Sequence, residues 1–247
     1  MRQILLTLIA GLTLSLAGCA GTPDNLVSDS RDPYEATNRK IYAFNMGVDD
    51  LVLEPAAKGY RKLPSPVRTG LTNHVTWTSY PGTAVNSALQ GKVENAALAT
   101  IHFLMNSLTL GFVDLVEDDE PEREDFGQTL AFWSAPEGPY IMAPLFGPGT
   151  VRSHTGLIVD ILTNPLGQLG EPALETVQLI GAPAGAVTFR GNNFDQINEV
   201  KYNALDPYAK TRSIFLQFRE GQINDGDTSA PSAADTEFDQ FFSDQKE

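Results

Sequence analysis

The residues that most often do chemistry in enzymes are few in this chain and poorly spaced for it. The three histidines, His74, His102 and His154, are far apart, and none belongs to a His-x-x-x-His pair with a matching carboxylate. The pattern therefore does not predict a zinc site. Ser153 and His154 are sequence neighbours, but no Gly-x-Ser-x-Gly elbow is present. We predict no catalytic residue, no metal ligand, no bound cofactor and no enzymatic activity.

The only cysteine, Cys19, ends a segment typical of protein export. Arg2 supplies a positive start, residues 4–16 are apolar, and Leu16-Ala17-Gly18-Cys19 ends in small residues and the cysteine. These four residues resemble the bacterial lipobox, in which residues 1–18 would be removed as a signal peptide and the cysteine would carry diacylglycerol and an acyl chain. Several acyl chains anchor a protein stably, since each buried CH₂ contributes about 0.8 kcal/mol. A plain secretory signal with a chance cysteine is the alternative.

The net charge of −14 is unevenly distributed. Acidic residues gather in 117–125 (EDDEPERED) and in the tail 221–247, and the rest of the chain is nearly balanced. A nucleic-acid-binding domain would need a basic face, so the composition argues against that class of partner. We expect residues 19–31 to be a tether, 32–220 one folded domain, the acidic run to be solvated, and 221–247 a disordered acidic tail.

The elements of the folded domain are predicted to be helices. Asp32 is expected to cap a first helix over 32–45, with Pro33 at its first position. Ser65-Pro66 is expected to start the next, and Pro81 to open another that Gly91 ends. Further helices are predicted over 92–116, 126–136, 152–166, 171–187, 194–205 and 206–220, the last capped by Asp206. Sustained alternation of period two is largely absent, which favours an all-α fold.

Two apolar stretches are unusual. Residues 138–152, GPYIMAPLFGPGTVR, are too apolar for an ordinary loop and too rich in Gly and Pro for a helix or a central strand. We expect a rigid irregular turn that is either buried or turned toward lipid. Residues 92–116 are apolar but interrupted by polar residues, whereas a spanning helix needs about 20 predominantly apolar residues. A core helix or one at membrane depth is expected instead.

Several of these segments together resemble one family. Six blocks occur in this order: DPYEATNRKIYAFN (32–45), SPVRTGLTN (65–73), GKVENAALATIHFLMNSLTLGFVDL (91–115), EREDFGQTLAFW (122–133), GPYIMAPLFGPGTVR (138–152) and DPYAKTRSIFLQFRE (206–220). The order is similar to that of the MlaA (VacJ) family of outer-membrane lipoproteins. The resemblance covers about residues 32–220. Ala20, which follows the cysteine where an inner-membrane lipoprotein would have Asp, also fits an outer-membrane location by resemblance.

The resemblance implies a ring-like assembly of helices embedded in the inner leaflet of the outer membrane. Misplaced phospholipid would pass through its channel to a periplasmic carrier, and trimeric porins would be partners. Apolar outer faces are available within 96–116 and 155–187. Residues expected to flank the route are Asn38, Asn45, His102, Asn106, Tyr140, Met142 and Phe146. A structural lipoprotein that tethers porins or cell wall without moving lipid is the alternative, and a lipoprotein hydrolase is a third class.

Overall fold

The computed structural model describes residues 29–116, 120–168 and 172–225, without the side chains of 167–180 and 182. The chain divides into two units, Met1–Ser30 and Arg31–Glu247, and the second is described below. The predicted signal peptide, Cys19 and tail residues 226–247 lie outside the described residues.

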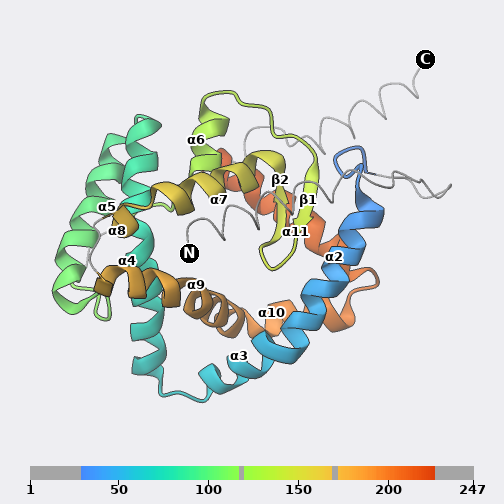
Figure 1. The fold of residues 1–247 in the computed structure, drawn as a ribbon, viewed down its shortest axis with the longest axis horizontal. Coiled ribbons are helices and arrows are strands. Elements are labelled where there is room, and N and C mark those ends of the chain that lie inside the picture. Colours follow the sequence, from blue (N-terminus) through green and yellow to red (C-terminus); the bar gives the residue numbers. More distant parts are fainter. Residues whose placement is uncertain (1–28, 117–119, 169–171, 226–247) are drawn as a thin grey trace. The chain divides into compact units, whose positions relative to one another are not determined.

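Helices make up most of the second unit (Figure 1). In chain order the elements are α2 (Glu35–Val48), the π-helix η2 (Asp49–Leu53), α3 (Glu54–Arg61), α4 (Ser65–Leu89), α5 (Val93–Asn106), the 3₁₀ turn η3 (Ser107–Thr109), α6 (Phe126–Phe132), β1 (Tyr140–Ala143), β2 (Gly147–Thr150), α7 (Val151–Thr163), α8 (Pro165–Gln168), α9 (Pro172–Asn192), α10 (Phe194–Asn198), the π-helix η4 (Glu199–Asn203) and α11 (Pro207–Ile223). The predicted helical class is confirmed, with two short strands added.

These elements form a closed circuit of contacts within the unit. Helix α2 packs on β1, β2 on α7, α7 on α6, α6 on α4, α4 on α9, α9 on η2, and η2 returns to α2. Figure 1 shows the α4–α5 pair on one side of this circuit and α2 with the strands on the other. Within the described part of the chain, no helix combines the length and the apolar character needed to cross a bilayer.

The first helix and the Pro81 boundary differ from prediction. Asp32 does not cap α2, whose N-cap is Tyr34 without a side-chain hydrogen bond, because the Asp32 carboxylate is buried among other partners. Helix α4 runs through Pro81 to Leu89 instead of starting again there. The hydroxyl of Thr78 donates to the carbonyl of Val75 in the turn before Pro81, a local bond of the kind that accompanies such interruptions.

The helix predicted over 92–116 ends ten residues early, at Asn106. Leu110 and Gly111 both adopt positive φ and turn the chain back, and the amide of Gly111 donates to the carbonyl of Asn106 at 2.8 Å. A Cβ at Gly111 would also lie 2.4 Å from the Cβ of Trp77, so both the turn and the packing require glycine there.

The stretch predicted to be an irregular turn contains a β-hairpin. Tyr140 pairs with Thr150 and Ala143 with Gly147, in an antiparallel sheet of two strands. Residues 144–146 form the loop that joins them, and Leu145 in this loop and Gly147 at the start of β2 both adopt positive φ. Pro148 is tolerated because the sheet has only two strands, both of them edges. The prediction of a turn was wrong because edge strands accept the Pro and Gly that central strands exclude.

The acidic run and the tail boundary also need correction. Glu124 is buried, and Asp125 accepts a hydrogen bond from the amide of Gln128 to cap α6, so this end of the run is not solvated. Helix α11 begins as predicted, with the Asp206 carboxylate capping the amide of Ala209. It continues to Ile223, three residues into the predicted tail.

Candidate functional site

The hairpin is held by two asparagines of α2 that lie seven residues apart. Asn38 donates to the carbonyl of Tyr140 at 3.2 Å and accepts from the amide of Met142 at 3.0 Å. Asn45 donates to the carbonyl of Ala143 at 3.0 Å and accepts from the amide of Leu145 at 2.8 Å. Asn38 thus bonds β1, and Asn45 bonds the end of β1 and the turn, each as a neighbouring peptide group would. The two asparagines position the hairpin tip over a distance of about 100 residues in sequence.

A buried carboxylate fixes the more deeply buried asparagine. Asp32, only 1% exposed, accepts hydrogen bonds from Asn38 at 2.8 Å, from Arg212 at 2.6 Å and from the Tyr208 hydroxyl. Burial, followed by the hydrogen bond to Asp32, raises the pKa of Tyr208, so this hydroxyl stays a proton donor. The cluster ties the chain before α2 to α11 beside the hairpin.

Replacing Asn38 by alanine is expected to destabilise the protein more than replacing Asn45. Asn38→Ala leaves the buried Met142 amide, the Tyr140 carbonyl and one Asp32 oxygen short of a partner, and each buried orphan costs about 1–3 kcal/mol. Asn45 is only partly buried, so water can replace part of its bonding. We expect a loss above about 2 kcal/mol for Asn38→Ala and about 1 kcal/mol for Asn45→Ala, measured by chemical unfolding in detergent. Equal losses would contradict this account.

The candidates for a lipid route are mostly buried. His102 and Tyr140 are fully buried, and Asn38, Asn106 and Met142 are at most 3% exposed. The Asn106 carboxamide is used internally, donating to Asp114 at 2.9 Å and accepting from the Leu115 amide at 2.8 Å. These five side chains lie inside the fold with little exposed surface.

Two candidates have a different placement. Asn45 is partly buried beneath the hairpin, whereas Phe146 at the hairpin tip is 64% exposed and its neighbour Leu145 is 69% exposed. His102, although buried against Tyr80, has no hydrogen-bond partner for either ring nitrogen among the described residues, and its Nδ1 lies 3.9 Å from an Asp114 oxygen. Of the candidates, Phe146 is therefore the one positioned to touch a molecule outside the fold.

Ser153 and His154 have separate structural tasks. The Ser153 hydroxyl accepts from the amide of Thr150 and donates to its carbonyl, completing the capping box of α7. Nε2 of His154 faces the carbonyl of Ile141 at 3.2 Å, and burial lowers the pKa of this histidine. Neither side chain is directed toward the other as a nucleophile and its base would be.

Two charged clusters join elements that are far apart in the sequence. Arg190 of α9 and Lys201 of η4 both contact Asp49, at 2.8 and 2.6 Å, and Lys201 also reaches Glu54. Near α6, Arg219 of α11 holds Asp125 with two bonds of 2.6 and 2.7 Å. Three acidic side chains group at Asp49, Asp50 and Glu54, but the Lys201 ammonium already occupies their centre.

These ion pairs predict loss of stability in acid. Hydrogen bonds from Lys58 and then Tyr202 hold the pKa of Glu54 at about 2, against an ordinary value of 4.5. The bond from Arg39 lowers the pKa of Asp206 in the same way. A carboxylate with a depressed pKa contributes stability above its unfolded pKa and loses it as pH falls through the folded one. We therefore expect the melting temperature to fall between pH 4.5 and 2.

The control for this pH dependence is Glu54→Gln, which should flatten the decline. Asp160 acts with the opposite sign, because burial raises its pKa and its protonation favours the folded state. Asp160→Asn should therefore steepen the decline relative to the wild type. A melting temperature that stays constant down to pH 2 would contradict the assignment.

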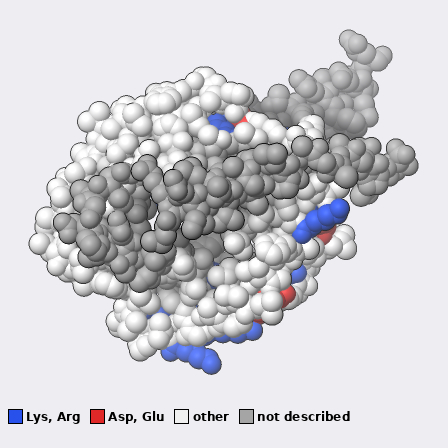
Figure 2. Space-filling model, in the orientation of Figure 1, with Lys and Arg blue, Asp and Glu red and all other residues white. Residues whose placement is uncertain are grey.

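The outer surface is strongly apolar. Among side chains that the structure describes, buried polar residues outnumber buried apolar ones, which reverses the usual pattern of a soluble domain. Exposed apolar residues follow the end of α5 and its loop, and one face of α7: Ile101, Leu104, Met105, Leu108, Leu110, Phe112, Val113 and Leu115, and Leu157, Ile158, Ile161 and Leu162. In Figure 2 most of the surface that is not grey carries no charged residue, and charge gathers toward the lower and right edges.

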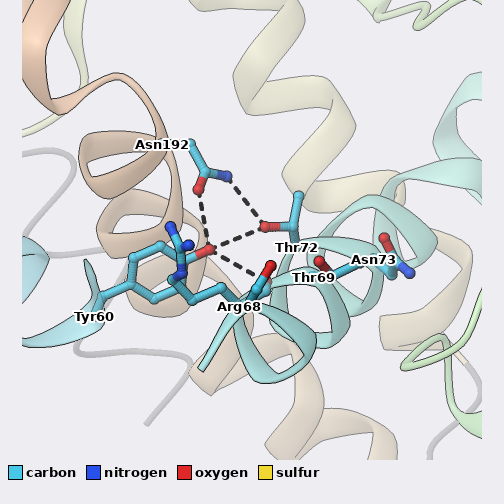
Figure 3. A pocket seen from close by; sticks show the side chains of 7 residues that line it. Tyr60, Arg68, Thr69, Thr72, Asn73 and Asn192 are labelled. Atoms are coloured by element: carbon cyan, nitrogen blue, oxygen red, sulfur yellow. Dashed lines mark hydrogen bonds between the residues drawn. The ribbon is translucent and has the colours of Figure 1, made fainter. Parts of the chain in front are cut away.

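Sequence reasoning anticipated these apolar faces in position but missed a polar pocket. The expected outer faces, 96–116 and 155–187, include both exposed groups, although side chains 167–180 lie outside the described set. A separate pocket of about 240 Å³ lies where α3, α4 and α9 meet (Figure 3). Its lining includes Tyr60 and Arg68. The SPVRTGLTN block contained Arg68, but only the fold shows what surrounds it.

The comparisons with known proteins agree with this arrangement. The family described as MlaA lipoprotein matches residues 30–222. The chain is 31% identical over 236 residues to the intermembrane phospholipid transport system lipoprotein MlaA of Haemophilus influenzae, covering 91% of this chain and 92% of the relative. It is 29% identical over 245 residues to the protein of that name from Escherichia coli K12, covering 92% and 91%.

A solved structure is also similar. It comes from work described as the structural basis for maintenance of bacterial outer membrane lipid asymmetry, and it matches with a TM-score of 0.65 and 28% identity. The match covers 78% of this chain and 98% of the solved one. The family match, the relatives and this structure agree over the helical circuit, and the chain therefore belongs to the MlaA lipoprotein family.

Proposed function

We propose that this protein is the outer-membrane lipoprotein of an intermembrane phospholipid transport system. It takes phospholipid that is misplaced in the outer leaflet and passes it to a periplasmic carrier, which maintains the lipid asymmetry of the membrane. It does so without covalent chemistry. Relatives bear the name of such a system, and the similar solved structure concerns outer membrane lipid asymmetry.

The observation that carries the proposal is the apolar exterior of the helical circuit. Leu108 is 78% exposed and Leu162 is 64% exposed. Large exposed apolar patches mark surfaces that contact protein or lipid. Helices suit a lipid environment because they satisfy their backbone groups internally. Both properties support the proposal that the circuit lies among the acyl chains of one leaflet.

The lipid anchor and the protein partners belong to the same proposal. Diacylglycerol and an acyl chain on Cys19 hold the protein in the periplasmic leaflet of the outer membrane, after removal of residues 1–18. A trimeric porin steadies the circuit in the bilayer, and the periplasmic carrier receives the lipid. The direction of net lipid transfer is set by the higher affinity or the energy supply of later components, because a passive route alone cannot set it.

Deleting the gene and labelling surface phospholipid with a reagent that cannot cross the membrane tests the proposal. Outer-leaflet phospholipid should rise several-fold and return to normal with the wild-type protein. Cys19→Ala, which removes the anchor, should fail to restore it even when it is exported. If surface phospholipid does not rise on deletion, the protein is instead a structural lipoprotein that tethers envelope components.

A further inference from the structure

The pocket between α3, α4 and α9 is built from hydrogen-bonding groups, and no carboxylate lines it among the residues that the structure describes. Its walls include Tyr60, Arg68, Thr69, Thr72, Asn73 and Asn192, which are labelled in Figure 3. Hydroxyl, amide and guanidinium groups all donate hydrogen bonds. A cavity of about 240 Å³ is smaller than the usual site for a drug-sized molecule, so it suits a compact polar group and not a whole two-chain lipid.

The pocket wall is fixed by bonds between three helices. The Tyr60 hydroxyl lies 3.0 Å from the amide oxygen of Asn192 and 3.1 Å from the Thr72 hydroxyl. Asn192 in turn donates to Thr72 at 3.1 Å. Figure 3 shows these three side chains turned toward one another. Because α3, α4 and α9 each contribute one of them, the pocket is formed before any ligand arrives.

Arg68 is the unusual member of the pocket. Every other partly or fully buried arginine that the structure describes contacts a carboxylate: Arg39, Arg152, Arg190, Arg212 and Arg219. Arg68 is partly buried, and among the described residues its guanidinium contacts no carboxylate; its buried Nε has no hydrogen-bond partner. A partly desolvated charge without a counter-ion is unfavourable, so an anion from outside the chain is expected there.

The surroundings add positive potential. Lys62, in the connection between α3 and α4, is exposed, and its ammonium group has no hydrogen-bond or ion-pair partner among the described residues. Ser65, which also lines the pocket, is the first residue of α4, whose positive dipole end favours an anion. Guanidinium groups hold phosphate with two parallel hydrogen bonds, a geometry that an ammonium cannot reproduce.

We propose that this pocket binds a phosphate group, with Arg68 as its charged ligand and the hydroxyls of Thr69 and Thr72 beside it. The same chemistry fits the phosphodiester of a phospholipid headgroup and free inorganic phosphate. The lipid source rests on the proposed function, in which the pocket would hold the headgroup of a lipid in transit while its acyl chains stay among the apolar faces.

Calorimetric titration of the full lipoprotein in maltoside detergent, which contains no phosphate, tests the site. The probes are dihexanoyl phosphatidylglycerol, inorganic phosphate and dihexanoylglycerol, which lacks phosphate. Arg68→Gln should weaken binding of the phosphate-containing probe tenfold or more. Arg68→Lys keeps the positive charge but loses the two parallel hydrogen-bond donors of the guanidinium. Its affinity for the probe should lie between those of Arg68→Gln and the wild type. Lys40→Gln makes the same charge change at an exposed residue that does not line the pocket and should alter binding less than threefold.

The outcomes distinguish a lipid headgroup from free phosphate as the ligand, and they distinguish failure of the phosphate site from failure of the proposed function. Binding of phosphatidylglycerol alone identifies a lipid headgroup, and equal binding of inorganic phosphate identifies phosphate itself. Unchanged binding in a folded Arg68→Gln protein, or equal binding of the phosphate-free lipid, would overturn the site. A protein that binds phosphate through Arg68 but does not clear surface phospholipid would overturn the proposed function and leave the site intact.

Discussion

Gly156→Ala is expected to lower the free energy of unfolding by about 3 kcal/mol, because α6 and α7 touch through their backbones at this residue. A Cβ at Gly156 would lie 2.2 Å from the backbone nitrogen of Gly127 and 2.6 Å from its Cα. No side-chain rotation can relieve a clash with backbone atoms, so the two helices must move apart. That movement would also disturb the Asp125–Arg219 pair beside Gly127, which joins α6 to α11.

Gly82→Ala is the matched control for this prediction. Gly82 is also inside a helix, but a Cβ there meets no atom within 4 Å. Alanine favours helix over glycine by about 0.8–1.0 kcal/mol, so this variant should be slightly more stable than the wild type. Both variants are compared by chemical unfolding followed by circular dichroism in one detergent. A Gly156→Ala protein as stable as Gly82→Ala would show that α6 and α7 are not in backbone contact.

Arg190→Met should cost about 3–5 kcal/mol, since it removes one partner of a buried ion pair. Arg190 is 3% exposed and Asp49 is 4% exposed, and their closest contact is 2.8 Å. The change leaves Asp49 with Lys201 alone and takes a donor from the carbonyl of Phe194. The pair joins α9 to η2, so its loss opens the circuit of contacts at one of its closing points.

Arg61→Met provides a control with the same chemistry in a different environment. The Arg61 guanidinium also lies over the ring of Phe194, at 4.6 Å compared with 4.8 Å for Arg190. Its ion pair with Asp195 is solvent-exposed, and such pairs contribute at most about 1 kcal/mol. The difference in unfolding free energy between the two variants therefore reports burial of the ion pair. Equal effects would mean that contact with Phe194, and not the buried pair, stabilises this corner.

Local signals in the sequence predicted much of the helical framework. Helix caps and Gly or Pro boundaries act over three or four residues, so the Asp206 cap and the break at Gly91 could be placed without knowing the fold. The order of six blocks predicted the family, which the comparisons confirm over residues 30–222. The apolar segments that form the exposed faces of α5 and α7 could also be predicted, because apolar composition can be read directly along the chain.

Only the tertiary structure decided which polar groups meet. The hairpin at 140–150 forms beside Asn38 and Asn45, about 100 residues away, and no local pattern reveals those partners. Likewise, no local pattern indicates that Asp125 pairs with Arg219, which is 94 residues away. The burial of most route candidates also became evident only in the fold. The Arg68 guanidinium is the sharpest case. It contacts no carboxylate among the described residues, and its surroundings are created by three separate helices.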